Sequence, residues 1–265
     1  MPPKQPLADR NFTGLTRRFK RNIYDSPKGQ LRLAVLERDF NELGIFSTKS
    51  NQSLEILDVG AGQGQFALQL ASQGHQLTLT DVSQEMLERA QMAANTLALN
   101  YLPCFEVIDL WSLAKRNNQA QYDVVMCHAV LEWLEEPLLA IDALSRLVKP
   151  GGYLSLLFYN VHGLVFKNLL RANYKKVIAK DVRGQKGSLT PINPQNPDDI
   201  IAQLLLNGMK VRCHSGVRVF HDYIFNREDR SRDPEKMQAL ELDLSRKEPY
   251  RGLGRYVHVM AQNIE

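Results

Sequence analysis

The chain has 265 residues, 44% hydrophobic and 23% charged, with a net charge of +4, which predicts a soluble protein able to bury a sizeable core. No apolar run reaches the roughly 20 residues that span a bilayer, and the first ten residues lack the apolar stretch of a signal peptide. The three cysteines form no CxxC pair, which disfavours a disulfide framework or a cysteine zinc site, and the expected location is the cytoplasm.

Residues 1–50 are expected to form an N-terminal helical cap. A short basic amphipathic segment covers residues 11–21. Ser26 is then a suitable N-cap, and Pro27 suits the first position of a helix that is predicted to run to about Leu43.

Residues 51–160 show apolar runs that alternate with helical patterns. Strands are predicted at 53–59, 76–80, 104–108, 122–127 and 153–159, and helices follow the first, second and fourth of them. Strands and helices that alternate at this spacing predict an α/β fold with a doubly wound, mostly parallel sheet, of the Rossmann-like type.

The pattern changes after Asn160. Helices are predicted at 161–180 and 198–207, with a basic loop between them at 182–197. We expect residues 161–209 to form a basic helical insertion with a return helix. Residues 210–265 are expected to complete a seven-stranded sheet, with strands at 210–219 and 256–261 and a charged helical stretch at 221–244.

The most informative stretch follows the first predicted strand, where Asp58 precedes Gly60, Gly62 and Gly64. Twenty-one positions after Gly60, Asp81 ends the second strand. Glycines let the backbone approach a ligand closely, and a carboxylate at that place accepts both hydroxyls of a ribose. The stretch therefore predicts a pocket for a nucleoside.

Two nucleoside cofactors are considered. The GxGxG pattern is one residue shorter than the GxGxxG of dinucleotide sites, which disfavours a nicotinamide dinucleotide and its pyrophosphate. S-adenosylmethionine has no phosphate, and Asp58 is placed to orient its ammonium group.

Asp109 ends the third strand, where a carboxylate meets an adenine amine, and the run from Lys149 to Gly152 matches a turn common in class I methyltransferases. The ordered set predicts S-adenosylmethionine, although Asp81 alone would also suit a helix cap and Asp109 alone a turn.

Six further segments resemble one family over nearly the whole chain, from about Arg10 to Ala261. They are Arg21–Tyr24, Lys28–Arg32, His128–Trp133, Phe158–Leu164, Gly216–Tyr223 and Leu253–Val259. The family they resemble is the bacterial tRNA 5-carboxymethoxyuridine methyltransferase, which converts the carboxylate of that wobble uridine to a methyl ester. The resemblance implies cofactor contacts at Arg32, Gly60, Ala61, Asp81, Asp109, Leu110 and His128. Together with Asp58 and Gly62 these are the predicted cofactor-binding residues.

Ala61 is a small departure from the family, which has glycine there; an alanine with ordinary backbone angles would be tolerated.

A carboxylate acceptor needs no general base, because it is already anionic at neutral pH. Catalysis then depends on positioning the reactants and on cationic or hydrogen-bonding groups that hold the carboxylate. No cluster of metal-binding carboxylates is seen, so no metal is expected. The candidates for positioning the substrate are Tyr24, Tyr159, Asn160, Arg218, His221, Tyr223 and Arg255, with His162 and Arg32 considered beside them.

For some polar residues near the predicted strands, a structural role is the alternative or the expectation. Arg218 and His221 would equally suit a surface pair or a capped turn. His258 lies in the middle of the last strand and is expected to be structural, and Glu132 with Trp133 is expected to cap and pack a helix.

Positive charge is concentrated in two segments, which suits a nucleic-acid phosphate backbone. Residues 1–38 carry nine Lys and Arg against three acidic residues, and residues 167–187 carry seven against one. A solvated helix face is the alternative explanation. The predicted tRNA contacts are Arg17, Arg18, Arg21, Lys167, Arg171, Lys175, Lys176, Lys180, Arg183 and Lys186.

These features predict an S-adenosylmethionine-dependent carboxyl O-methyltransferase that acts on modified wobble uridine in tRNA. Two alternatives stay open: a methyltransferase for small carboxylic acids or phenols on the same scaffold, and a non-catalytic protein that binds tRNA or the cofactor.

Overall fold

The computed structural model describes residues 26–46, 52–116, 119–181, 191–226 and 228–265. Within these ranges lies a seven-stranded sheet of order β3-β2-β1-β4-β5-β7-β6. Strands β1 to β5 run parallel, and β7 runs antiparallel to both of its neighbours. The strands are β1 (Glu55–Val59), β2 (Gln76–Asp81), β3 (Cys104–Val107), β4 (Tyr122–His128), β5 (Val148–Tyr159), β6 (Met209–Val217) and β7 (Tyr256–Asn263). The prediction of a doubly wound, mostly parallel sheet is confirmed.

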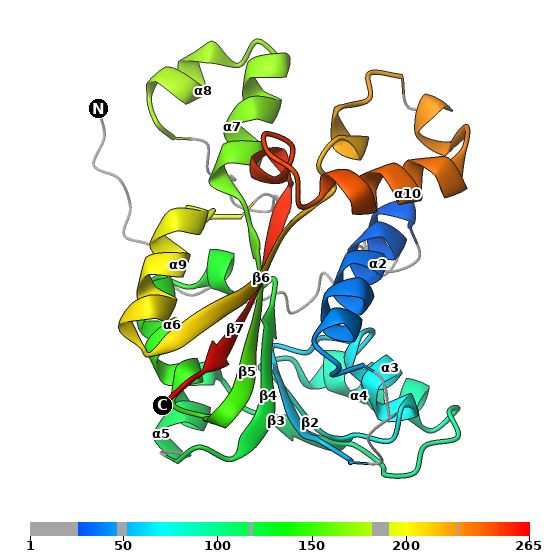
Figure 1. The fold of residues 1–265 in the computed structure, drawn as a ribbon, viewed down its shortest axis with the longest axis vertical. Helices are drawn as coiled ribbons and strands as arrows, with labels where there is room; N and C mark the ends of the chain where they lie inside the picture. Colours follow the sequence, from blue (N-terminus) through cyan, green and yellow to red (C-terminus); the bar gives the residue numbers. More distant parts are fainter. Residues whose placement is uncertain (1–25, 47–51, 117–118, 182–190, 227) are drawn as a thin grey trace.

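Helices cover both faces of the sheet (Figure 1). One face carries α2 (Pro27–Glu42), α3 (Ala67–Ser72) and α4 (Gln84–Ala94), and the other carries α5 (Leu110–Arg116), α6 (Pro137–Ser145) and α9 (Pro197–Leu206). Side chains of β4 alternate between two cores: Val124 and Met126 pack on the α2 side, whereas Val125 and Cys127 pack on the α6 side. A strand buried on both faces explains why this segment is continuously apolar.

A further layer lies beyond the carboxyl ends of the parallel strands. It contains α7 (Val161–Leu170), α8 (Tyr174–Ile178) and α10 (Pro234–Leu244), which project above the sheet in Figure 1. Short 3-10 turns complete it: η3 (Leu131–Trp133), η4 (His221–Tyr223), η5 (Glu228–Ser231) and η6 (Arg251–Leu253). Ligands of open α/β sheets bind at this edge, so these elements surround the expected site.

Asn160 joins the sheet to this layer. Its side-chain oxygen accepts from the backbone N–H of His162 at 2.9 Å and caps α7, while its amide donates to the carbonyl oxygens of Gly252 and Gly254, both at 2.9 Å. The side chain is fully buried. These bonds hold the turn before β7 against the start of α7.

Two helix predictions were wrong in detail, and one helix was not predicted. The predicted helix at 161–180 is two helices, because Ala172 adopts a φ of 53° and the chain turns at Asn173. The stretch at 221–244 is helical only from Pro234, after two 3-10 turns. Helix α5 was not predicted, although Asp109 stands directly before it.

The segment from Lys149 to Gly152 was predicted as a tight turn before a strand. The structure includes it in β5, with the register against β4 shifting nearby and Gly151 at a φ of 79°. Lys149 is tied there by ion pairs to Glu55 at 2.8 Å and Asp123 at 3.1 Å.

No helix in the described part of the chain is both long and apolar enough to cross a membrane.

The contact between α7 and the turn before β7 gives a stability prediction. A Cβ on Gly163 would collide with the carbonyl oxygen of Gly254, which is backbone and cannot rotate away. We expect Gly163→Ala to lower the free energy of unfolding by about 1–3 kcal/mol, measured by chemical denaturation. Gly252→Ala is the matched control, because its nearest atom would be the Glu248 carboxylate at 3.8 Å. Equal stability of the two variants would contradict the tight contact.

Candidate functional site

The glycine turn after β1 forms as predicted. Gly60, Gly62 and Gly64 adopt φ values of 71°, 58° and 66°, a left-handed conformation that other residues rarely adopt. A Cβ on Gly60 would also collide with Val130, which follows β4. Ala61 has no positive φ, so the alanine that replaces the family's glycine sits in ordinary backbone. The turn therefore leaves its backbone open at the carboxyl edge of the sheet.

Asp81 at the end of β2 supports the turn. Its Oδ2 accepts the N–H of Gly62 at 2.9 Å, and its Oδ1 accepts the N–H of Ser83 at 2.8 Å. Each oxygen keeps a further lone pair, which two ribose hydroxyls require. Burial raises the pKa of Asp81, and the two amides oppose this shift. The N-cap of α4 is Ser83, so the helix-cap alternative for Asp81 is wrong, and its two amide contacts leave both oxygens able to accept from a ligand.

Asp109 precedes α5 and has a capping role. Its carboxylate accepts from the N–H of Ser112 at 2.9 Å and from the hydroxyl at 2.6 Å, which lowers its pKa. These contacts are those of a turn-forming residue, which was the alternative role for Asp109. The carboxylate is partly exposed, so an adenine amine could also approach it. Leu110 beside it is buried in the core with Leu113.

Asp58, at the end of β1, is a buried carboxyl without a hydrogen bond to any described residue. Burial and the neighbouring Asp81 raise its pKa to about 7, against the opposing effect of Arg32. Arg32 reaches this edge from α2 and donates to Gln65 at 3.3 Å. A buried acid beside an open glycine turn suits a cationic ligand group such as an ammonium, so these residues fit S-adenosylmethionine.

Glu132 lies in η3 directly after β4 and was expected to cap and pack a helix together with Trp133. It is 1% exposed, and neither carboxyl oxygen has a hydrogen-bond partner among the described residues. Burial raises its pKa to about 8, and nearby amides of Glu132 and Tyr159 and the charge of Arg32 offset only part of this. The one sequence signal for this buried acid was its position inside the apolar run that follows β4.

A second group of charges surrounds Asp222, which the sequence analysis did not select. We call Lys28, Lys167, Arg218, Asp222 and Arg255 the Asp222 cluster. The carboxylate lies 3.7 Å from Lys28 Nζ, 3.7 Å from an Arg218 nitrogen and 3.3 Å from Arg255 Nε. Burial alone would raise the pKa of Asp222, but Arg218 and the other cations lower it well below its usual range. One carboxylate therefore faces several cations.

Lys167 completes the cluster from α7. Burial, followed by the charges of Arg255 and Arg171, lowers its pKa to about 8, and Asp222 opposes this only in part. No ion pair to its ammonium is found within the described ranges. The excess of positive charge provides a place for an anionic group of the substrate.

Several predicted substrate residues meet at this cluster. Tyr159 and Tyr256 lie below the guanidinium groups of Arg255 and Arg218, at 5.0 and 5.3 Å. Arg255 donates to the Tyr159 hydroxyl, and the Tyr223 hydroxyl donates to the carbonyl oxygens of Gly163 and Leu253, at 3.0 and 2.7 Å. The structure thus brings together Tyr159, Arg218, Tyr223 and Arg255.

The remaining candidates differ in their surroundings, and His221 contacts Asp222 of the cluster directly. Asn160 is fully buried with its amide bonded to backbone, which argues against direct contact with substrate. His221 is buried beside Asp222 at 3.3 Å, and its N–H donates to Glu241 at 2.7 Å. His162 is exposed and lies 3.3 Å from Asn196. Tyr24 lies outside the described residues.

The predicted tRNA contacts of the second basic segment lie on or next to α7 and α8. Arg171, Lys175, Lys176 and Lys180 are exposed, and none forms an ion pair with a described residue. Tyr174 between them is 58% exposed. Arg17, Arg18, Arg21, Arg183 and Lys186 lie outside the described residues.

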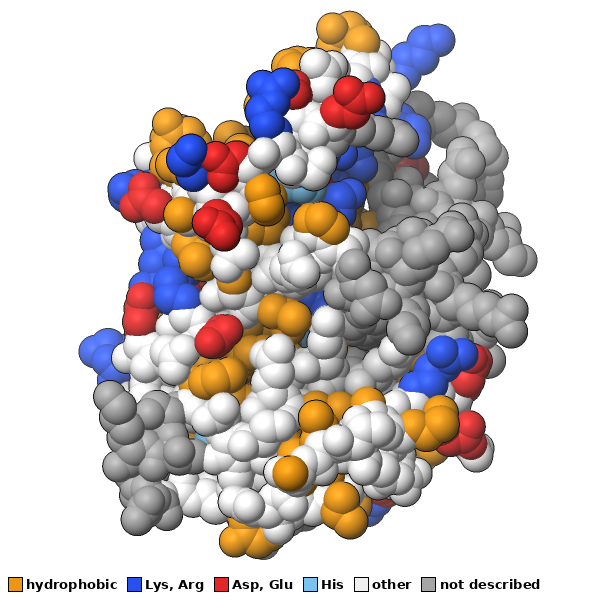
Figure 2. Space-filling view, turned by 90° about the vertical axis from the view of Figure 1, so that its right-hand side faces the viewer, with side chains coloured by type: hydrophobic (Ala, Val, Ile, Leu, Met, Phe, Trp, Pro, Cys, Tyr) orange, Lys and Arg blue, Asp and Glu red, His pale blue; other side chains and the backbone are white. Residues whose placement is uncertain are grey.

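The α10 side of the molecule has a different surface. Figure 2 shows positive and negative side chains interspersed there, as in the ion pairs Lys236–Asp233 at 2.8 Å and Lys247–Asp243 at 2.7 Å.

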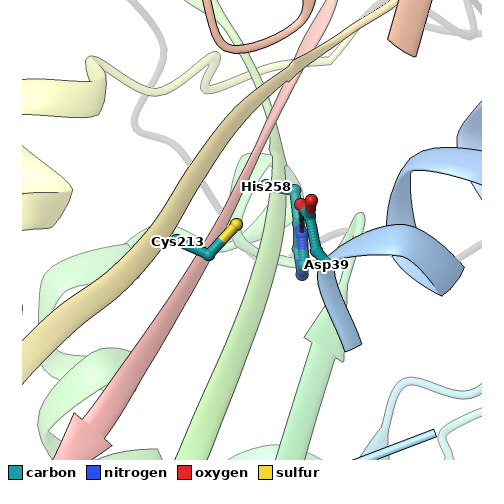
Figure 3. Close-up of side chains that lie close together, drawn as sticks. All are labelled: Asp39, Cys213 and His258. Carbon is teal, nitrogen blue, oxygen red and sulfur yellow. Dashed lines mark hydrogen bonds and ion pairs between the residues drawn. The ribbon is translucent and has the colours of Figure 1, made fainter. Parts of the chain in front are cut away.

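The side chains of Asp39, Cys213 and His258 are of types that can bind a metal ion, and they lie close together (Figure 3). Asp39 Oδ1 also accepts from Arg38 at 2.8 Å and from Arg246 at 2.6 Å, and Arg246 lies 3.0 Å from Cys213 Sγ. A cation placed among them would face two guanidinium groups. We therefore interpret the group as a buried ion-pair cluster.

His128 ends β4 and is half-buried, with Nε2 2.8 Å from the Ser155 hydroxyl. Burial and the charge of Arg32 lower the pKa of His128 well below the usual value, so the ring is neutral. His258 is fully buried and bonded to Asp39, in agreement with the structural role expected for it.

Comparisons with known proteins agree with this architecture. A family model described as a methyltransferase domain matches residues 57–156. The tRNA 5-carboxymethoxyuridine methyltransferases of Escherichia coli K12 and O157:H7 are each 37% identical over 256 residues, covering 97% of both chains. A ubiquinone biosynthesis O-methyltransferase of Vibrio atlanticus is 34% identical but covers only 59% of this chain.

Among solved structures, the magnesium protoporphyrin IX methyltransferase of Synechocystis PCC 6803 with bound SAH superposes with a TM-score of 0.62 at 20% identity. The match covers 96% of this chain and 95% of that one. At this identity the likeness shows the fold.

The raised pKa of Glu132 gives a prediction for stability. Between the ordinary pKa of 4.5 and about 8, the unfolded carboxyl is ionised while the folded one stays protonated, so the free energy of unfolding falls as pH rises. Glu132→Gln removes this dependence. Relative to the unmodified protein, the variant should gain roughly 3 kcal/mol between pH 5 and pH 8, measured by denaturant unfolding.

The exposed Glu136→Gln is the control for this substitution and should follow the unmodified protein at each pH. The assignment fails if Glu132→Gln shows the same pH dependence as the unmodified protein.

Proposed function

Since the chain belongs to the family of tRNA 5-carboxymethoxyuridine methyltransferases, within the S-adenosylmethionine-dependent class I methyltransferases, we propose that it methylates the carboxylate of 5-carboxymethoxyuridine at the tRNA wobble position. The product is the methyl ester. We place this activity in the cytoplasm.

The observation that carries the choice of acceptor is the Asp222 cluster. Four cationic side chains from α2, α7, the end of β6 and the start of β7 surround a single carboxylate. A neutral phenol would leave this excess of charge unbalanced in a half-buried place, at a cost in free energy. An anionic acceptor balances it, and the carboxylate of 5-carboxymethoxyuridine has the required charge.

S-adenosylmethionine, when bound, supplies an activated methyl group. Asp81 would hold the ribose hydroxyls, Arg32 the methionine carboxylate and Asp58 the ammonium, on the backbone of the glycine turn. Arg255 and Arg218, held by Asp222 and by aromatic rings, would fix the acceptor carboxylate. The acceptor oxygen carries no proton, so no residue has to remove one, and the protein contributes by orientation and by excluding water.

Helices α7 and α8 suit the tRNA backbone. Helix α8 has no buried residue. The exposed Lys175 and Lys176 directly follow Tyr174 and have no acidic partners among the described residues. Exposed cations beside an aromatic ring match the phosphates and unstacked bases of an anticodon loop. This surface adjoins Lys167 of the Asp222 cluster, so the wobble base and the backbone can be held together.

Methyl transfer to modified tRNA tests the proposal. The protein is incubated with labelled S-adenosylmethionine and tRNA carrying 5-carboxymethoxyuridine, and the tRNA is digested to nucleosides. We expect an alkali-labile methyl ester of the modified uridine. An unmodified transcript of the same tRNA should stay unlabelled. Equal labelling of the free nucleoside would favour a small-molecule enzyme, and no labelled ester would reject the proposed reaction.

The α8 surface is tested by charge reversal. Lys175→Glu with Lys176→Glu should weaken tRNA binding at least tenfold and make its loss with salt shallower, because these two side chains no longer neutralise phosphates. Affinity for S-adenosylhomocysteine, measured by calorimetry, should be unchanged. The control is Lys115→Glu with Lys210→Glu, at exposed positions on α5 and β6 far from α8. Equal loss of tRNA binding in both variants would indicate a non-specific charge effect.

A further inference from the structure

A continuous chain of hydrogen bonds runs from α2 to the carboxyl edge of the sheet. Asp39 Oδ2 lies 2.7 Å from His258 Nδ1, His258 Nε2 lies 2.9 Å from the Ser155 hydroxyl, and that hydroxyl lies 2.8 Å from His128 Nε2. Asp39, Ser155 and His258 are fully buried. Water is therefore excluded from these links, and each proton position depends on its neighbours. We call this the Asp39–His128 chain.

The sheet register places these side chains together. Leu157 of β5 pairs with His128 of β4 on one side and with His258 of β7 on the other. Ser155 is two residues from Leu157, so its side chain lies on the same face, between the two histidines. The two rings meet edge to face with centroids 5.9 Å apart. The connection is thus built from three adjacent strands.

Asp39 decides which atoms donate and which accept along the Asp39–His128 chain. Burial alone would raise the pKa of this carboxyl, but His258 and Arg38 lower it well below its usual range, so Asp39 is ionised and can only accept. Nδ1 of His258 must then carry a proton. Arg38 and Arg246 already bring two positive charges to the one buried carboxylate, Asp39, so a second proton on His258 would add to an excess of buried positive charge. The chain therefore needs a single proton on His258, at Nδ1, which leaves Nε2 as an acceptor.

The direction of the hydrogen bonds continues through Ser155 to His128. The hydroxyl has one proton and donates it to Nε2 of His258, so its oxygen accepts from Nε2–H of His128. His128 is neutral, and its Nδ1 then has a lone pair. We propose that the Asp39–His128 chain fixes His128 in its Nε2–H tautomer and so makes its Nδ1 a hydrogen-bond acceptor for the ammonium of the cofactor's amino-acid end.

An acceptor at this place has a chemical consequence. An ammonium group only donates, whereas a carboxylate only accepts. With Nδ1 unprotonated, His128 favours the ammonium and leaves the methionine carboxylate to Arg32. No described residue bonds to Nδ1, so it is available to a ligand. Asp39, Ser155 and His258 are positioning residues, since they act on the cofactor only through His128.

The tautomer can be observed without tRNA or turnover. The inference rests on the proposed function only in requiring S-adenosylmethionine at this edge, so ¹⁵N NMR of the histidine-labelled full chain tests it separately from methyl transfer. We expect the His128 signals, identified by their loss in His128→Gln, to show a protonated Nε2 and an unprotonated Nδ1. A protonated Nδ1 in the unmodified protein would overturn the inference.

Asp39→Asn should reverse the donor and acceptor roles along the Asp39–His128 chain. The introduced amide keeps an oxygen for the two arginines but presents its NH₂ group to His258, which must then accept at Nδ1 and donate from Nε2. Ser155 would donate to His128, whose proton would move to Nδ1. Replacing the carboxylate of a His–Asp pair by an amide has this effect in serine proteases. Affinity for S-adenosylhomocysteine, by calorimetry, should fall at least tenfold.

Two further variants separate tautomer control from loss of structure. Ser155→Ala cuts the chain without reversing it, so the His128 signals should average between tautomers; a single unchanged Nε2–H form would overturn the inference even if Asp39→Asn failed to fold. Ser215→Ala is the matched control. Its hydroxyl contacts Arg38 at 2.9 Å and Arg246 at 3.2 Å but lies outside the chain, so tautomer and affinity should stay unchanged.

Discussion

The site depends on how α2 is fixed to the sheet, and the buried carboxylate of Asp39 does much of this. It binds Arg38 of its own helix, His258 of β7 and Arg246 beyond α10, and Arg38 also donates to the carbonyl oxygen of Leu242 at 2.6 Å. An ionised group buried in this way requires all of its partners. Since α2 also carries Lys28 and Arg32, the same contacts fix where these two cations lie relative to the sheet.

The two halves of the site have opposite charge character. Around the glycine turn, buried acids suit a ligand that carries an ammonium and a sulfonium. Around Asp222, cations predominate and suit an anion. The charge of Arg32 acts on both halves, since it opposes the rise in pKa of Asp58 beside the glycine turn and of Tyr256 beside the Asp222 cluster. This arrangement would suit two reactants of opposite charge at one edge of the sheet.

Much of this could be predicted from sequence where the signal is local. The glycine turn, Asp81 and the Ser26 cap each depend on a few adjacent residues, and the structure forms them as expected. Asp222 and the Asp39–His128 chain could not be predicted, because their partners come from elements up to 219 positions apart. The break at Ala172 and the buried place of Glu132 depend on packing against the rest of the chain, which local pattern does not encode.

The raised pKa values of Asp58 and Glu132 are consistent with transfer to a carboxylate. An ionised, unpaired carboxylate enclosed with the reacting groups would compete with the substrate for the methyl group. Burial keeps Glu132 protonated at neutral pH, since its pKa is about 8, and a protonated acid is a poor nucleophile. Asp58 is less shifted, at about 7, and a cationic ligand would favour its ionised form. Burial thus raises the pKa of both acids, and a bound cation would act in the opposite direction at Asp58.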